Sequence, residues 1–290
     1  MPNELKDLFQ KIVAKFPLPK KKTSPPALLR PFVPSDFQPL PPGWNVKSPD
    51  FVGVAAGKSG TSWWYSLLLQ HPRVVQNRLG RKELHYFDHF QYRGISEEQI
   101  KTYCQAFAAP ENSICGEWSP NYLTHPFCME YLARSAPNTK ILILLRNPVD
   151  RMLSQMNFLS SHHLNSFNFN RDERYLYQLY TIYLNSCIHS YYTVGLKELL
   201  KYFPRSRILV LQYERCKVNP LEEIQKTYRF LEIDDRYQPA NIDRPVNKMN
   251  YSIAPFTVEE RRRVADFFAE EMRSTRDLFP EIDLSLWENA

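Results

Sequence analysis

Cysteine is scarce in this chain and never forms a paired motif. The five cysteines are scattered, odd in number and without CxxC or zinc-finger spacing: positions 104, 115, 128, 187 and 216. A disulfide framework is typical of short secreted chains with an even set of cysteines. We therefore expect free thiols in a reducing compartment.

The chain also lacks a long apolar run and a strong charge excess. No stretch is long and apolar enough to span a bilayer, and the first residues, MPNELKDLFQ, lack a signal-peptide core. We expect a soluble, cytoplasmic protein without membrane contact. The net charge of +6 on 290 residues, without an arginine-rich arm, fits an anionic ligand and requires no nucleic acid. A homo-oligomer is compatible with the sequence, which does not decide it.

Proline divides the chain. Residues 1–48 hold ten of the 23 prolines, which favours extended conformation in an N-terminal extension. Within it, residues 4–16 show the apolar spacing of a short helix. The chain is 43% hydrophobic, enough for a sizeable core. We expect residues 49–290 to form a single domain.

Strand and helix patterns alternate in this domain. Apolar runs at residues 51–55, 140–145 and 207–212 predict buried strands. Helical patterns cover residues 62–71, 96–108, 148 to at least 157, most of 175–200, 220–231 and 257–272. Capping boxes begin two of these helices at Ser96 and Thr257, and Asn147 caps the one that opens with Pro148. Strands separated by helices predict a P-loop-like three-layer α/β fold, with a central parallel sheet covered by helices on both faces.

The stretch FVGVAAGKSGTSWW, residues 51–64, predicts a phosphate-binding loop between a strand and a helix. Backbone N–H groups at a helix N-terminus attract anions, and the helix dipole favours negative charge there. Lysine adds a full charge, hydroxyls add donors, and glycines can take a positive φ. The candidate ligand residues are Gly57, Lys58, Ser59, Gly60, Thr61 and Ser62.

This loop differs from an ATP-binding Walker loop, G-x-x-x-x-G-K-[ST]. The spacing from Gly53 to Gly57 and Lys58 is one residue short. A P-loop ATPase also needs a strand-end carboxylate that helps to hold Mg²⁺, but the run KILILL ends at Arg146. We therefore expect side chains to neutralise the phosphate, without a metal. A kinase with a degenerate Walker loop is the alternative, and a nucleotide-binding protein that has lost catalysis is another.

Five motifs carry a resemblance over residues 50–287. GKSGTSWW is followed by KELHYFD (82–88), GEWSPNYL (116–123), LLRNPVDRMLS (144–154) and LQYERCKVNP (211–220). In this order they resemble the cytosolic and Golgi sulfotransferase superfamily, in particular its heparan-sulfate-type and related bacterial branch. The resemblance implies metal-free transfer of a sulfuryl group from 3′-phosphoadenosine 5′-phosphosulfate (PAPS) to a hydroxyl or amine. The product would be adenosine 3′,5′-bisphosphate (PAP).

The resemblance also implies which residues bind PAPS. The loop 57–62 would cradle the 5′-phosphosulfate, with Lys58 on the leaving phosphate. Arg146 and Ser154 would hold the 3′-phosphate, and Lys248 would contact it from a closing loop. An ion pair with Asp150 is the alternative for Arg146. We expect Arg151 to be a helix-surface residue.

Glu83 is the candidate general base. It matches the glutamate that heparan-sulfate-type enzymes place beside the acceptor hydroxyl, and it can take a proton if burial raises its pKa toward working pH. His85, two residues on, would lie on the same face if the segment is extended, and would then orient the acceptor or Glu83. Glu117 is an alternative base or an acceptor contact. Trp118 stands where related enzymes often carry lysine, and suits a flatter, less charged acceptor.

The acceptor is expected to be a small, natural-product-like molecule of secondary metabolism; a saccharide is the alternative. The charge excess is modest, and residues 156–192 are rich in aromatic side chains. A tyrosine series at helical spacing is typical of core packing. The preceding Asn-, Ser- and His-rich part is interpreted as a lid over the acceptor.

Overall fold

The computed structural model describes residues 30–163, 182–244 and 257–288. The chain divides into a unit Met1–Pro31 and a compact unit Phe32–Ala290. The latter carries everything described below. Within it, Phe32 is buried, and its ring lies 4.3 Å from that of Tyr86. The helix predicted at residues 4–16 lies outside the described residues.

Five parallel strands form the central sheet, in the order β3-β5-β2-β6-β7. Their bounds are β2 Phe51–Ala55, β3 Val74–Val75, β5 Ile114–Trp118, β6 Lys140–Leu145 and β7 Ile208–Gln212. β2 lies in the middle and pairs with β5 on one side and β6 on the other. Two short strands, β1 (Trp44–Asn45) and β4 (Ala109–Pro110), form a separate antiparallel pair.

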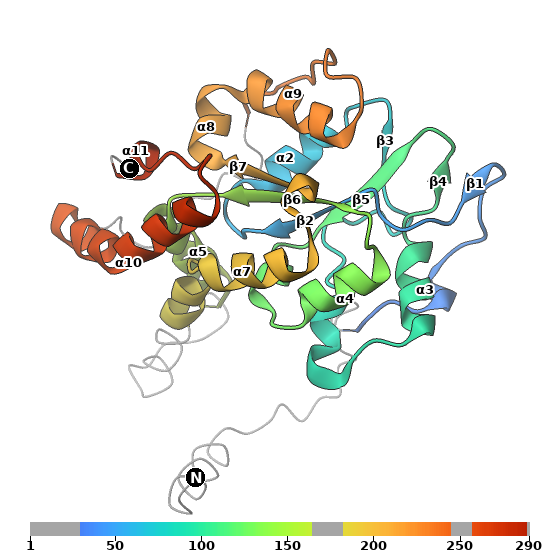
Figure 1. The fold of residues 1–290 in the computed structure, drawn as a ribbon, viewed down its shortest axis with the longest axis horizontal. Coiled ribbons are helices and arrows are strands. Elements are labelled where there is room, and N and C mark those ends of the chain that lie inside the picture. Colours follow the sequence, from blue (N-terminus) through green and yellow to red (C-terminus); the bar gives the residue numbers. More distant parts are fainter. Residues whose placement is uncertain (1–29, 164–181, 245–256, 289–290) are drawn as a thin grey trace, which may run out of the picture. The chain divides into compact units, whose positions relative to one another are not determined.

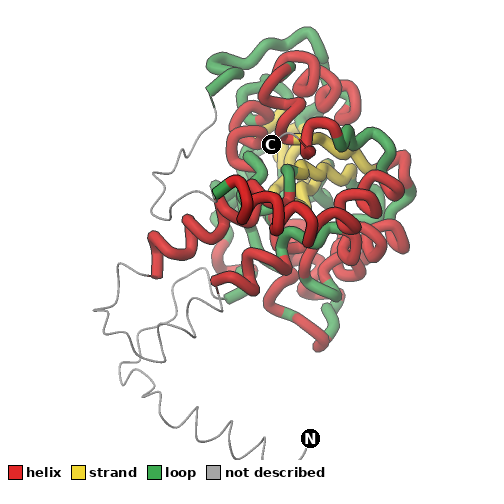
Figure 2. The backbone as a smooth tube through the Cα atoms, turned by 90° about the vertical axis from the view of Figure 1, so that its left-hand side faces the viewer, coloured by secondary structure: helices red, strands yellow, loops and turns green. Residues whose placement is uncertain are grey.

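Helices cover both faces of this sheet. In Figure 1, α2, α8 and α9 lie on one side of the strands, and α4, α5 and α7 lie on the other. Figure 2 shows the strands enclosed between the helices. The helix bounds are α2 Thr61–Leu68, α3 Glu97–Gln105, α4 Cys128–Ser135, α5 Pro148–His163, α7 Thr193–Tyr202, α8 Tyr213–Val218, α9 Pro220–Leu231, α10 Val258–Leu278 and α11 Ser285–Glu288. The short 3₁₀ helices among the described residues are η2 Pro34–Asp36, η3 Phe87–His89, η4 Gln91–Arg93, η5 Pro120–Thr124 and η7 Arg205–Arg207.

The strands are apolar throughout because both of their faces are buried. Along β6, Ile141, Ile143 and Leu145 belong to the core on one face, while Leu142 and Leu144 belong to the core on the other. This alternation is the strand period of two applied to two cores. It confirms the predicted three-layer α/β fold with a central parallel sheet.

The predicted elements agree with the structure at most positions. The three predicted strands are β2, β6 and β7, and the capping boxes at Ser96 and Thr257 are present. Asn147 caps α5 with its Oδ1, 2.9 Å from the Val149 amide. The region predicted as mostly helical at 175–200 is interrupted: residues 182–188 are helical, and α7 begins only at Thr193.

Two strands of the sheet, β3 and β5, were not predicted. β5 reads ICGEW, and its apolar pattern is broken by Gly116 and Glu117, although all five residues are buried. A glutamate within a buried strand is stable only when other groups form hydrogen bonds with its carboxylate.

In the part of the chain that the structure describes, no helix has the length and apolar composition needed to cross a membrane. All five cysteines are free thiols.

Candidate active site

The phosphate loop, residues 57–62, connects the end of β2 to α2. The Ala56 amide donates to the Leu144 carbonyl at 2.9 Å, which fixes the start of the loop on the neighbouring strand β6. Gly60 is the N-cap of α2 with φ of 87°, and Lys58 also has a positive φ, 68°. The positive φ angles therefore fall on Lys58 and Gly60, and not on Gly57 as also considered.

Two arginines fix the peptide units of this loop. Arg146 follows β6 directly, and its Nη1 donates to the Lys58 carbonyl at 3.1 Å. Arg151, in the first turns of α5, donates from Nη1 to the Gly57 carbonyl at 3.3 Å. The strand end and α5 therefore each supply one hydrogen bond that holds the turn formed by the loop backbone.

Arg151 is not a surface residue, so that prediction is wrong. Its side chain is fully buried, and its other donors engage Ser190 Oγ, at 2.7 Å, and the Ser186 carbonyl. These partners are neutral, and burial lowers the pKa of Arg151 to about 10. Asp150 pairs with Arg261 at 2.8 Å and not with Arg146, so the alternative considered for Arg146 is also wrong.

The surroundings of the loop fit an anion. Within the described residues, Ser59 Oγ and Arg146 Nε are buried polar atoms without a hydrogen-bond partner. The Lys58 ammonium lies 4.2 Å from the centre of the Phe158 ring. Burial, together with the charges of Arg146 and Arg151, lowers the pKa of Lys58 to about 8. Buried cations near one another are costly unless an anion compensates them, so a bound phosphate would relieve this cost.

Ser154 lies on α5 one turn after Arg151 and is partly buried. Residues three apart share a helix face, so Ser154 lies on the side of α5 that contacts the loop. Lys248 lies outside the described residues, as does the segment 164–181, which contains most of the predicted lid.

A cluster of four charged side chains, Lys82, Glu83, His85 and Asp88, lies beside the phosphate loop. We call it the charge cluster. His85 contacts Glu83 Oε2 through Nε2 at 3.0 Å and Asp88 Oδ2 through Nδ1 at 2.7 Å. An extended backbone was expected at His85, but its φ of 49° lies in the left-handed region. The predicted contact between His85 and Glu83 nevertheless forms.

The pKa of Glu83 is lowered, whereas a raised pKa was expected. Burial raises it, but hydrogen bonds and charges from His85 and Lys82 outweigh burial and lower it to about 2. Burial would lower the pKa of His85, but Asp88 and Glu83 outweigh that effect and raise it to about 10. The Glu83 side chain is therefore an ionised carboxylate between two cations.

Lys82 was not singled out by sequence analysis. Its Nζ donates to Thr61 Oγ1 and to Ser62 Oγ, both at 3.0 Å, and lies 2.6 Å from Glu83 Oε1. The side chain is 16% exposed. The signal was present, because Lys82 immediately precedes Glu83, but its contact with α2 depends on the tertiary fold.

Glu117 is an anchor for the charge cluster and not a solvent-facing base. It is fully buried in β5, and its oxygens accept hydrogen bonds from the hydroxyls of Tyr103 and Tyr122, at 2.8 and 3.0 Å. They also accept bonds from the Leu84 amide, at 3.0 Å, and from Ser119 Oγ, at 2.5 Å. Burial raises the pKa of Glu117. Since protein donors surround both oxygens, an acceptor has no access to Glu117.

Trp118 does not face an acceptor, so that prediction is wrong. The side chain is fully buried in the core, and its Nε1 donates to the Ala55 carbonyl at 2.9 Å. The ring packs against Gly53, where any Cβ atom would lie 2.1 Å from it. Trp118 therefore supports β2 beneath the phosphate loop.

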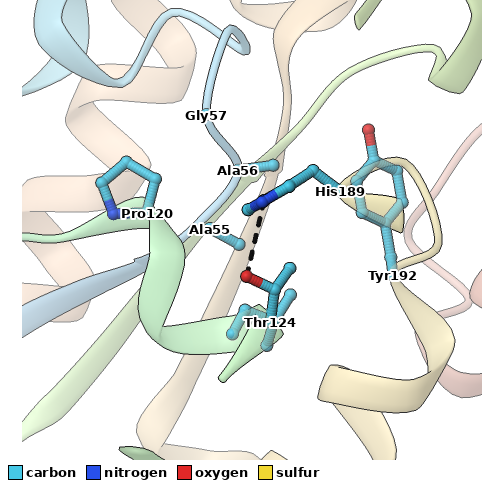
Figure 3. A pocket seen from close by; sticks show the side chains of 8 residues that line it. Ala55, Ala56, Gly57, Pro120, Thr124, His189 and Tyr192 are labelled. Atoms are coloured by element: carbon cyan, nitrogen blue, oxygen red, sulfur yellow. Dashed lines mark hydrogen bonds between the residues drawn. The ribbon is translucent and has the colours of Figure 1, made fainter. Parts of the chain in front are cut away.

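A small hollow opens beside Gly57. It is lined by Ala55, Ala56, Gly57, Pro120, Leu123, Thr124, His189 and Tyr192. In Figure 3, Thr124 from η5 and His189 point toward one another, with Oγ1 and Nδ1 3.4 Å apart. Burial and the charge of Arg151 lower the pKa of His189 to about 4, so the ring is neutral at physiological pH. The lining carries no ionised side chain at that pH.

Comparisons with known proteins agree with this geometry. The sulfotransferase domain model matches residues 48–252, more than half of the chain. The chain therefore belongs to the sulfotransferase domain family.

Individual relatives are more distant. Heparan sulfate glucosamine 3-O-sulfotransferase 5 of Homo sapiens is 27% identical over 199 residues, which cover 67% of this chain and 56% of that protein. Membrane-associated sulfotransferase kil1 of Dictyostelium discoideum is 33% identical over 110 residues, 38% of this chain and 23% of that protein. The chain thus matches about a quarter to about half of the length of these relatives. A sulfotransferase structure from Alicyclobacillus acidocaldarius shares the fold, with a TM-score of 0.62, 24% identity, and coverage of 84% of this chain and 100% of that one.

Proposed function

We propose that this protein transfers the sulfuryl group of PAPS to a hydroxyl or amine of an acceptor. The observation that carries the proposal is that the phosphate loop and the candidate base, Glu83, lie next to each other. One ammonium group, that of Lys82, contacts both the hydroxyls at the start of α2 and the carboxylate of Glu83. A donor phosphate on the loop would therefore lie next to a group that can take a proton.

PAPS supplies an activated sulfuryl group, and the residues of this chain fit its phosphates. Lys58 would stabilise the charge on the leaving 5′-phosphate, together with the amides of residues 60–62 and the hydroxyls of Ser59, Thr61 and Ser62. Arg146 and Ser154 would hold the 3′-phosphate, because the guanidinium follows β6 at the strand end where ligands bind in open α/β sheets. Lys248 is proposed for the same phosphate.

Glu83 would accept the proton of the acceptor, and His85 would fix its orientation. His85 contacts Glu83 with one ring nitrogen and Asp88 with the other, so the ring cannot turn without losing a partner. A carboxylate held in this way is a preorganised general base once its pKa approaches working pH.

We propose a small, weakly charged acceptor. The modest net charge of the chain, +6, supports this choice. A polyanionic acceptor would favour a strongly basic groove. Saccharide sulfation is the second candidate, favoured by the similarity to the 3-O-sulfotransferase. The cytoplasmic location and the role in secondary metabolism remain predictions.

The first experiment compares thermal stability with PAP and with ATP plus Mg²⁺. A ligand that binds only the folded state adds RT ln(1 + [L]/Kd), about 2.7 kcal/mol at a hundredfold excess. We expect stabilisation by PAP in the presence of EDTA. Stabilisation by ATP and Mg²⁺ alone would refute the proposal and favour the kinase alternative. Turnover of PAPS with neutral phenols and alcohols, compared with heparan-type oligosaccharides, then decides the acceptor class.

A further inference from the structure

Lys82 connects two parts of the proposed reaction that must lie on opposite sides of the transferred group. Its three N–H donors are directed to Thr61, Ser62 and Glu83, which is the full donor capacity of an ammonium. The first two partners begin α2, where the phosphate binds. The third is the proposed base. The sulfuryl group must pass between these partners, and the Lys82 ammonium is already there.

From this position, and resting on the proposed function, we propose that Lys82 binds the sulfuryl oxygens during transfer. To bind them, Lys82 gives up its contact with Glu83. Since no fourth donor is present, a contact with a sulfuryl oxygen requires the exchange of an existing partner. Glu83 is the partner that can be exchanged most readily. Its side chain is 38% exposed, and it keeps His85 as a partner when Lys82 leaves.

The exchange would prepare Glu83 for its role. The groups that face its carboxylate are Lys82 and His85 on its own segment and Lys58 from the phosphate loop. Burial favours the protonated form, whereas His85 and Lys82 hold the pKa of Glu83 near 2. Loss of the Lys82 contact removes one of these two cations, so the carboxylate becomes a stronger base when the donor is bound. Lys82 itself is largely buried, and burial lowers its pKa, so an anion at this point stabilises its charge.

The balance of the step assigns a separate task to each residue. Glu83 takes the proton as the acceptor oxygen bonds to sulfur. The bond from sulfur to the bridging oxygen breaks, and its electron pair stays on the 5′-phosphate beside Lys58. Lys82 stabilises the charge on the sulfuryl oxygens, which belong to neither the leaving phosphate nor the acceptor.

The test compares two ligands that differ by the sulfuryl group. PAP and PAPS are titrated separately by calorimetry into the full chain, without acceptor. For Lys82→Met we expect PAPS affinity to fall roughly tenfold or more, as for one lost charge-assisted hydrogen bond. PAP affinity should stay within about twofold, and retained PAP binding shows that the variant is folded. Lys82→Arg should restore most of the lost affinity. Lys101→Met, on the exposed face of α3, is the matched control and should leave both affinities unchanged.

Each other result has a distinct meaning. An equal loss of PAP and PAPS affinity would make Lys82 a phosphate ligand and overturn the assignment to the sulfuryl group. Unchanged affinities in Lys82→Met would reduce Lys82 to a support of the loop and overturn it as well. If the unmodified protein does not bind PAP at all, the proposed function itself fails.

A second measurement follows the exchange directly. The Glu83 carboxylate is observed by ¹³C NMR and assigned by its absence in Glu83→Gln. We expect no titration of this signal above about pH 4 in the free protein, and titration in that range when PAPS is bound. PAP should not produce the change. A signal that is indifferent to PAPS would show that Lys82 does not leave Glu83.

Discussion

The phosphate loop and the charge cluster lie next to each other but are built in different ways. The loop is shaped by backbone: β2 ends, Gly60 takes a left-handed conformation, and α2 begins. The charge cluster lies on an irregular segment and is held by contacts between its side chains. Glu117 of β5 also accepts a hydrogen bond from the Leu84 amide in this segment. One part of the site therefore depends on local conformation and the other on contacts between distant segments.

This difference decides how each part responds to change. A loop built by backbone tolerates side-chain substitutions that leave φ and the ligand contacts intact. A cluster built by side chains loses function when one member changes, even if the fold persists. The predictions below test this contrast from the largest expected effect to the smallest.

The largest effect is expected for Glu83→Gln. The amide keeps the shape of the side chain but cannot accept the acceptor proton, so turnover should fall roughly 10²- to 10⁴-fold. PAP affinity, measured by calorimetry, should be retained because the phosphate loop is untouched. Glu98→Gln, at an exposed position of α3, is the matched control. Normal turnover in Glu83→Gln would exclude Glu83 as the base.

Among substitutions at residues that hold the charge cluster in place, Glu117→Ala should destabilise the fold most. It leaves the hydroxyls of Tyr103, Tyr122 and Ser119 without their buried acceptor, whereas the Leu84 amide keeps Ser119 Oγ. One unsatisfied buried group costs about 1–3 kcal/mol, so we expect a loss of about 3 kcal/mol in the free energy of unfolding, measured with urea.

Glu117→Gln retains one acceptor oxygen and should cost less than Glu117→Ala. A Glu117→Ala variant as stable as the unmodified chain would show that Glu117 does not anchor the cluster.

The same contrast explains what the sequence could predict. The strand–loop–helix unit, Arg146 at the end of β6 and the capped helices follow from local patterns, and the structure contains them. The contact of Lys82 with Thr61, the burial of Arg151 and the inward direction of Trp118 do not follow. They depend on which segments the fold brings together, and on β5, whose Gly116 and Glu117 hid its strand pattern.

Gly60→Ala tests the backbone part of the site. The residue has a φ of 87°, and an added Cβ atom would lie 2.8 Å from the Tyr213 ring. A left-handed conformation costs an L-residue about 1–2 kcal/mol, so the free energy of unfolding should fall by at least that amount. PAP affinity should fall as well, because the first amides of α2 shift.

Gly80→Ala separates the two causes. It also has a positive φ, 64°, but no atom lies within 4 Å of its added Cβ. Its cost should be the conformational part alone, without loss of PAP affinity. Equal effects of both substitutions on PAP binding would contradict a specific role of Gly60.

The smallest effect is expected from the pH dependence of the charge cluster. His85 has a pKa raised to about 10 by Asp88 and Glu83, against burial. A raised pKa gives stability that is complete below the unfolded value, about 6.5, and is lost as pH rises toward 10. Glu83, with its pKa lowered to about 2, gives stability that is complete above about pH 4.5 and is lost as pH falls toward 2. These side chains are 24% and 38% exposed, so solvent screening keeps the effect below about 1 kcal/mol.

His85→Gln separates the alkaline limb from the acid limb. The stability difference between the unmodified chain and this variant, measured by urea unfolding, should shrink between about pH 6.5 and 10. His89, which also interacts with His85, has a pKa lowered by burial and is neutral in this range, so it does not contribute to the change. A difference that is constant across the range would mean that His85 is not held as a cation, and Glu83 would then keep Lys82 as its only charged partner on this segment.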